Sequence, residues 1–163
     1  MYVILLAVLA AGTSAASVPS PSTANPLYFF EGRTESTGVM RVMFGRPSRT
    51  HSVGQGRVEG DGSLSLVQKV DDEGKPAHER RWHIRLTGKG RFVGTVSEAS
   101  SKVVIDEVSG RYRFRFRVKG GMAVEQWMEA LPDGASVRYS TSVRKFGMKV
   151  AAGKGIIRKI PPR

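Results

Sequence analysis

The histidines and carboxylates with the spacing closest to a catalytic motif lie in one short stretch. His78 and Glu79 begin it and His83 ends it, which is similar to the zinc-protease pattern HExxH. That pattern needs two histidines four residues apart on one face of a helix, whereas these are five apart. The stretch also alternates like a strand, which places the two histidines on opposite faces. We predict no metal site here, and a lone His51 does not change that.

Other catalytic signatures also fail on their spacing. Gly54, Gly56 and Gly60 are spaced loosely like a phosphate-binding loop, but no Lys-Ser/Thr pair follows and no helix is expected after them. Glu125 and Glu129 flank a tryptophan in one expected strand, where acids are usually solvated. We predict no catalytic residue and no enzymatic activity. A cavity that held a histidine beside a carboxylate would reopen this question.

Composition limits the remaining chemistry. The chain has 163 residues and no cysteine, which excludes disulfides, thiol catalysis, thiolate metal sites and acylation of a lipoprotein cysteine. No cofactor is predicted. Lys and Arg number 26 against 14 acids, giving a formal net charge of +12. Such a balance favours anionic neighbours, such as nucleic acid, lipid headgroups or acidic glycans.

The N-terminal residues have the pattern of an export signal. Residues 3–11 are apolar and residues 12–16 are small, which predicts a signal peptide over 1–16, although no Lys or Arg precedes the apolar run. A Ser/Pro-rich tether is expected over 17–27. The alternative is a buried N-terminal helix or strand. We predict a periplasmic protein that is not a cysteine-acylated lipoprotein.

Any functional site must be built on β-strands, because the clearest pattern in the sequence is an alternation of apolar and polar side chains with a period of two residues. Over residues 111–118, Tyr112, Phe114 and Phe116 share one strand face and four arginines share the other. Gly- and Asp-rich turns recur about every ten residues, and short hairpins make consecutive strands antiparallel. The sequence predicts an all-β domain over 28–160. We expect an antiparallel up-and-down β-barrel of about 8–10 strands, with a β-sandwich as the alternative.

Two faces of this barrel carry the predicted binding residues. The inward apolar side chains form either a plain core or the lining of a cavity for a lipid or acyl chain; they are Trp82, Ile84, Tyr112, Phe114, Phe116, Met122, Val124 and Met128. The outward arginines form either a solvated face or a contact with an anionic membrane surface; they are Arg111, Arg113, Arg115 and Arg117.

Two other binding classes fit the pattern less well. Nucleic-acid binding needs aromatic and basic side chains on a shared surface, but strand alternation separates them here. An outer-membrane barrel needs strands of about 9–11 residues, longer than most of those expected. Neither class is predicted.

Several short motifs in succession resemble the bacterial envelope family called domain of unknown function 3833. They are FEGRTE at 30–35, Gly38-Val39, RWHI at 81–84, GRFVGT at 90–95, Trp127-Met128 and KFG at 145–147. The resemblance implies a lipocalin-like or calycin-like barrel that is exported, commonly as a lipoprotein. It also implies an association with fatty-acyl-modifying enzymes, but no established activity. This chain departs from the lipoprotein pattern because it has no cysteine.

Together these observations predict an exported, non-catalytic barrel. Its expected partner is an apolar or amphipathic ligand, such as a lipid or acyl chain, or the anionic envelope surface. The alternative is a structural or partner-binding barrel whose interior is filled by its own side chains.

Overall fold

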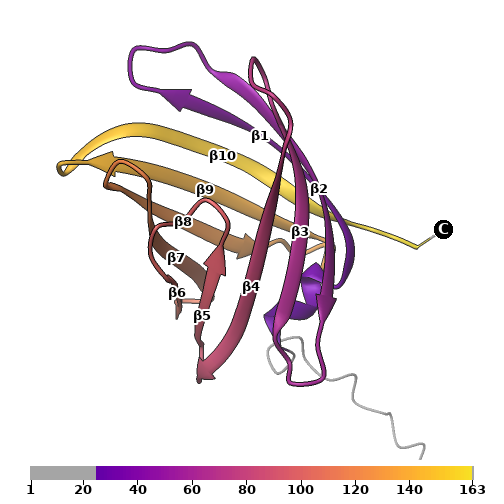
Figure 1. Cartoon of the computed structure of the whole chain (residues 1–163). Coiled ribbons are helices and arrows are strands. Elements are labelled where there is room, and N and C mark those ends of the chain that lie inside the picture. The colour runs from indigo at the N-terminus through magenta and orange to yellow at the C-terminus, as the bar shows by residue number, and fades with distance from the viewer. Residues whose placement is uncertain (1–24, 163) are drawn as a thin grey trace, which may run out of the picture.

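The computed structural model describes residues 25–162, and ten strands within them form a closed antiparallel barrel (Figure 1). A short 3-10 helix, η2 (Pro26–Phe30), precedes the strands. The strands are β1 (Gly32–Val42), β2 (Ser48–Val58), β3 (Leu64–Asp72), β4 (His78–Gly88), β5 (Arg91–Val96), β6 (Val103–Val108), β7 (Arg111–Val118), β8 (Met122–Ala130), β9 (Ser136–Lys145) and β10 (Met148–Ile160). The predicted signal peptide, residues 1–16, lies outside the described residues.

Each strand pairs with the next along the chain, and β1 pairs with β10 to close the barrel. The closing register joins Arg33 to Ile160 at one end and Val42 to Ala151 at the other. A meander of this kind needs only short hairpins and leaves no open sheet edge. The predicted up-and-down barrel is confirmed, and the alternative β-sandwich is wrong.

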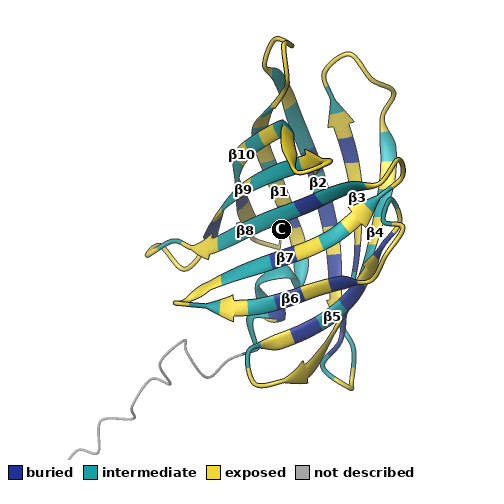
Figure 2. Ribbon diagram, turned by 90° about the vertical axis from the view of Figure 1, so that its left-hand side faces the viewer, coloured by how far each residue is buried: buried dark blue, intermediate teal, exposed yellow. Residues whose placement is uncertain are grey.

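The alternation in β7 orients its side chains as the sequence predicts. Phe114 pairs with Ile105 of β6 and Gln126 of β8, and Phe114 and Ile105 are buried inside the barrel. Arg113 pairs with Asp106 and Trp127 on the outer face. Figure 2 shows the same pattern elsewhere, with buried and exposed residues alternating along the strands and exposed residues at most turns.

The helix η2 closes one end of the barrel, near the turn between β2 and β3 (Figure 1). The Asn25 side chain accepts a hydrogen bond from the Leu27 amide at 3.1 Å, and Leu27 is buried in the core. The predicted tether therefore extends too far: Pro26 and Leu27 belong to the folded domain, because burial of Leu27 anchors the helix. No helix within residues 25–162 has the length and apolar character to cross a membrane.

Large and small side chains occupy different sides of the interior. The buried cluster draws mainly on β3–β7 and includes Leu64, Ile84 and Phe92. The inward positions of β1 and β10 include glycines, and the ring of Tyr139 on β9 lies against Gly38 and Gly155. A β-carbon at either glycine would collide with this ring. The side of the barrel formed by β1 and β10 therefore contributes little side-chain volume to the interior.

Candidate functional site

A cavity of about 720 Å³ lies inside the barrel. Its floor is formed by residues near η2, including Leu27, Leu64 and Ile157. Its lining continues to the opposite strand ends, where Val42, Lys75 and Lys145 are exposed. We call this second end the mouth. Ligand pockets of proteins have volumes of roughly 300–1,000 Å³, so the cavity has the size of a small-molecule site.

Three aromatic rings form one wall of the cavity. Trp82 of β4 meets Phe114 and Phe116 of β7 edge to face, with ring centroids 6.3 and 6.0 Å apart. The indole Nε1 of Trp82 donates a hydrogen bond to Oε1 of Gln68 at 2.8 Å. These contacts satisfy the partly buried indole N–H and fix the orientation of the ring. The wall is therefore apolar and preformed.

The cavity exists because small side chains face this aromatic wall. Ten strands enclose more space than the roughly eight whose side chains just fill a barrel. Inward positions on β1, β2, β9 and β10 carry small residues in the lining, which are Ser36, Thr50, Ser52, Thr141 and Ala151. No prediction made from the sequence rests on these small residues. Small residues at several inward positions of four strands would have pointed to an unfilled interior, although Met40, Tyr139 and Val143 interrupt the pattern.

A charged cluster lies near the mouth. The Arg80 Nε donates a hydrogen bond to Glu98 Oε1 at 2.6 Å, and His78 Nε2 lies 3.3 Å from the same oxygen. Burial raises the pKa of Glu98, but the charge and hydrogen bond of Arg80 outweigh it, so the pKa of this carboxyl is lowered overall. Glu98 is therefore an ionised partner of Arg80 and is poorly suited to act as a general acid.

Uncharged polar groups also reach the cavity, among them Gln126, Tyr139 and Thr141. They lie on β8 and β9. A few polar groups on an otherwise apolar lining are typical of sites that orient a ligand. Sequence reasoning missed these residues because isolated polar positions in a strand do not reveal what lies across the barrel.

Seven of the eight predicted lining residues contribute to the cavity, and the exception is Tyr112; the seven are Trp82, Ile84, Phe114, Phe116, Met122, Val124 and Met128. Tyr112 packs against Phe92, with ring centroids 6.0 Å apart. Burial, followed by the nearby charge of Glu107, raises the pKa of its hydroxyl. Tyr112 lies near the start of β7, at the closed end of the barrel, so its ring belongs to the packed core. A ligand contact by the other seven stays a prediction.

The outward arginines of β7 interact mainly with their neighbours. The guanidinium of Arg111 lies 4.7 Å and that of Arg113 5.5 Å from the centroid of the Trp127 ring. Arg115 Nη2 bonds Asp106 Oδ2 at 2.6 Å, and Arg113 lies 3.6 Å from the same oxygen. The predicted contact of Arg111, Arg113, Arg115 and Arg117 with an anionic surface stays a prediction. The local partners of the first three compete with it, whereas Arg117 forms no ion pair within residues 25–162.

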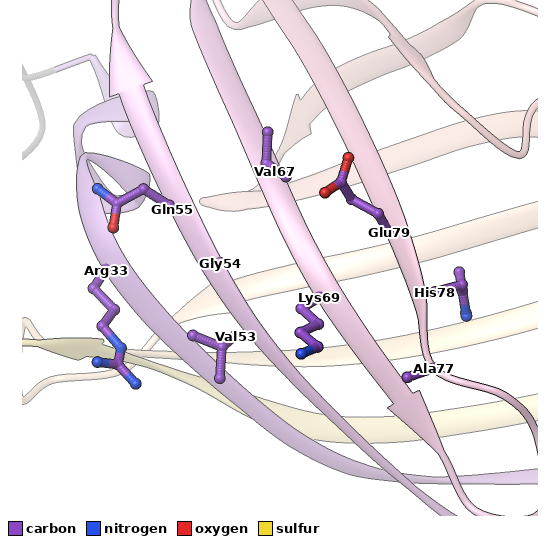
Figure 3. Close-up of a pocket in the computed structure, with 9 residues that line it drawn as sticks. All are labelled: Arg33, Val53, Gly54, Gln55, Val67, Lys69, Ala77, His78 and Glu79. Atoms are coloured by element: carbon purple, nitrogen blue, oxygen red, sulfur yellow. The ribbon is translucent and has the colours of Figure 1, made fainter.

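A second hollow lies on the outer face of β1–β4 (Figure 3). It is lined by Arg33, Val53, Gln55, Val67 and Lys69, together with residues of the β4 end. The hollow carries charges of both signs, and Val67 on its surface is exposed. It offers neither an enclosed apolar wall nor a converging set of polar groups. The interior cavity is the stronger candidate.

The motifs that resembled catalytic sites are dispersed. His83 lies beside Ser65, with Nδ1 and Oγ 3.4 Å apart, while His78 contacts Glu98 and His51 contacts Glu35. The Glu125 carboxylate accepts a hydrogen bond from the Trp127 indole at 3.0 Å. Within residues 25–162, no group of three or more His, Cys, Asp or Glu side chains is placed to hold a metal ion.

Comparison with known proteins identifies the family. The family described as "Protein of unknown function (DUF3833)" matches residues 5–159, so the chain belongs to it and the resemblance seen in the sequence is confirmed. No curated protein matches the sequence.

Two solved structures share the lipocalin-like barrel fold. An S-type phycobiliprotein lyase from Guillardia theta is 7% identical with a TM-score of 0.67, over 84% of this chain and 92% of that one. The protein Rv2717c from M. tuberculosis is 15% identical with a TM-score of 0.62, over 83% of this chain and 95% of that one.

Proposed function

We propose, for this member of the DUF3833 family, that the barrel binds one apolar or amphipathic molecule, such as a lipid or acyl chain, and leaves it chemically unchanged. The observation that carries this proposal is the cavity of about 720 Å³ with its apolar wall of Trp82, Phe114 and Phe116. We also propose that residues 1–16 direct export to the periplasm. A mature chain that lacks these residues in a periplasmic fraction would support this part of the proposal.

The arrangement of the cavity favours an amphipathic ligand bound tail first. The floor near η2 is apolar, so burial of a hydrocarbon tail there is favourable by ~0.8 kcal/mol per CH₂ group. The charged lining toward the mouth has an excess of cations, because Lys75, Arg80 and Lys145 outnumber the two acids there, Asp72 and Glu98. An anionic or polar headgroup fits that end, because it stays close to water and to positive charge.

Two alternatives are less well supported. A barrel filled by its own side chains does not leave a cavity of about 720 Å³. Catalysis has two histidine–carboxylate contacts in its favour, one between His78 and Glu98 and one between His51 and Glu35. The second pair is nearly half exposed to solvent, with side chains 44% and 46% accessible, so it offers no enclosed site. The name of the phycobiliprotein lyase shows that a barrel of this fold can belong to an enzyme. Here Arg80 already engages the Glu98 carboxylate at 2.6 Å, which fits an ion-pair network better than an acid–base pair.

Native mass spectrometry of gently purified protein tests the proposal directly. A co-purifying lipid, recovered with unchanged mass after incubation, supports binding without catalysis. The two tryptophans then locate the ligand, because Trp82 lines the cavity and Trp127 lies on the outer face. In a Trp127→Phe protein, a fatty acid that carries a spin label on its tail should quench the fluorescence of Trp82. The Trp82→Phe protein should show little quenching.

Two neighbouring alanines provide a matched pair of variants for this assay. Ala151 lines the cavity, whereas Ala152 is exposed on the outer face of the same strand. A cavity of about 150 Å³ holds a benzene ring, so the phenyl group of Ala151→Phe removes about a fifth of the space. In the Trp127→Phe background, Ala151→Phe should weaken quenching and Ala152→Phe should not. Equal quenching in both variants would contradict binding in the cavity.

A further inference from the structure

Two turns of the barrel lie side by side at the mouth. One joins β1 to β2 and the other joins β9 to β10; we call them the mouth turns and define them as residues 41–49 and 144–149. They are adjacent because β1 pairs with β10, and the Met43 amide donates a hydrogen bond to the Val150 carbonyl at 2.8 Å. Figure 1 shows both turns at the end of the barrel opposite η2.

Each mouth turn carries an aromatic ring in solvent. Phe44 is fully exposed and Phe146 is 89% exposed, and Val42, Met43 and Met148 beside them are also exposed. A soluble protein seldom gathers large apolar side chains in one exposed place without a binding role.

The backbone conformation at these two phenylalanines is also unusual. Phe44 has φ 60° and Phe146 has φ 50°, in the left-handed region that favours glycine and asparagine. Bulky residues at such positions are strained, and strain of this kind tends to be retained at functional sites. Folding alone would therefore favour a different residue at both turn positions.

The mouth turns themselves carry charged side chains of one sign only. The mouth turns hold Arg41, Arg46, Arg49, Arg144, Lys145 and Lys149, and no Asp or Glu occurs over residues 39–50 or 139–150. None of these six side chains forms an ion pair within residues 25–162. The β3–β4 turn at the same end of the barrel adds Asp72 and Glu73, and the Glu73 carboxylate accepts a hydrogen bond from the Arg49 amide at 2.8 Å. The six cations outnumber these two acids, so exposed aromatic rings beside an excess of positive charge complement the surface of an anionic phospholipid bilayer.

We propose that the mouth turns dock the barrel on an anionic phospholipid membrane, with Phe44 and Phe146 inserted among the acyl chains and the six cations on the headgroups. This orientation turns the mouth of the cavity toward the bilayer. An apolar ligand then passes between membrane and cavity without crossing water. The passage of a ligand rests on the proposed function, whereas the docking itself does not.

Sedimentation of the full chain with lipid vesicles tests the docking. The chain should bind vesicles containing phosphatidylglycerol, bind phosphatidylcholine vesicles much more weakly, and dissociate from the former as salt is raised. The double variant Phe44→Asn/Phe146→Asn should lose roughly tenfold or more in affinity for each buried ring. Asparagine suits the left-handed backbone, so the loss does not come from unfolding. Tyr28→Asn, which removes an exposed aromatic residue at the closed end, should bind as the wild type does.

A second matched pair of variants tests which cations of the protein contact the membrane. Arg46→Gln/Lys149→Gln removes two charges from the mouth turns and should weaken binding on the order of 30-fold. Arg111→Gln/Arg115→Gln removes two charges from the outer face of β7 and should have a much smaller effect. A larger loss in the β7 variant would overturn the proposal and place the contact on that strand.

Two further results would overturn the proposal: no binding to phosphatidylglycerol vesicles, or equal binding by the variant that lacks both rings. The latter would indicate nonspecific attraction to any polyanion. These outcomes leave the fluorescence test of ligand binding unaffected, so the two proposals fail separately.

Discussion

Replacing Phe44 with asparagine should stabilise the barrel, although it removes a large apolar side chain. The ring is fully exposed, so its loss sacrifices no burial. The backbone at this position has φ 60°. A left-handed conformation costs an ordinary L-residue about 1–2 kcal/mol, whereas asparagine adopts it readily. We therefore expect the free energy of unfolding to rise by about 1 kcal/mol.

The same substitution at Phe146 should stabilise less. Its φ of 50° carries a similar strain, but the Lys145 ammonium lies 5.6 Å from the centroid of the Phe146 ring. A cation–π contact at an exposed site is worth about 0.5–1 kcal/mol, and Phe146→Asn loses it. The net gain should therefore be less than about 0.5 kcal/mol. In a Lys145→Gln background the cation–π contact is already absent. Phe146→Asn should then raise the free energy of unfolding by about 1 kcal/mol.

Urea denaturation followed by circular dichroism measures these differences. With an m-value of about 2 kcal/mol/M, Phe44→Asn should raise the midpoint by about 0.5 M without changing m. Thermal unfolding should shift upward by roughly 3–5 °C. The reasoning is refuted if Phe44→Asn destabilises the protein, or if Phe146→Asn gains more than Phe44→Asn. Higher stability together with weaker vesicle binding would show that the rings are kept at the expense of folding.

Two further predictions concern the charged cluster and the closed end. The pKa of Glu98 lies below its ordinary value of 4.5, so its contribution to stability should be complete above about pH 5 and disappear as the pH falls through the folded-state pKa. The urea midpoints of wild type and Glu98→Gln should therefore differ at pH 7 and converge in acid; a constant difference would contradict the ion pair with Arg80. At the closed end, a β-carbon on Gly56 would collide with the Phe30 carbonyl, so Gly56→Ala should cost about 1–3 kcal/mol in urea denaturation. Gly60 has open space around it, and Gly60→Ala should stay within about 0.5 kcal/mol of wild type; equal losses in the two variants would show that η2 is not held at this contact.

The exchange of ligand between cavity and membrane connects the two proposals. The cavity and the mouth turns meet at Val42 and Lys145, which belong to both. A ligand whose headgroup lies near Arg80 would have its polar end toward the bilayer when the mouth turns are docked. Transfer would then need no large change in the barrel.

Local patterns along the chain were enough to predict the strands and their connections. Alternation at Tyr112, Phe114 and Phe116 assigns the faces of a strand, because successive side chains of an extended backbone point to opposite sides. Glycine and aspartate between such runs, as at Asp61-Gly62, predict tight turns and hence an antiparallel meander. Both rules act over a few residues, so they can be applied without knowing what lies across the barrel.

The empty part of the interior and the pairing of turns at the mouth depend on how the barrel closes, and local patterns did not predict them. The cavity depends on the aromatic wall at Trp82 facing small side chains such as Ala151 across the barrel, and its volume is the space that these side chains fail to fill. Likewise, Phe44 and Phe146 lie on neighbouring turns only because β1 pairs with β10. Such relations join residues far apart in the chain, and they arise when the sheet closes and fixes its register. Local propensities carry no information about that closure.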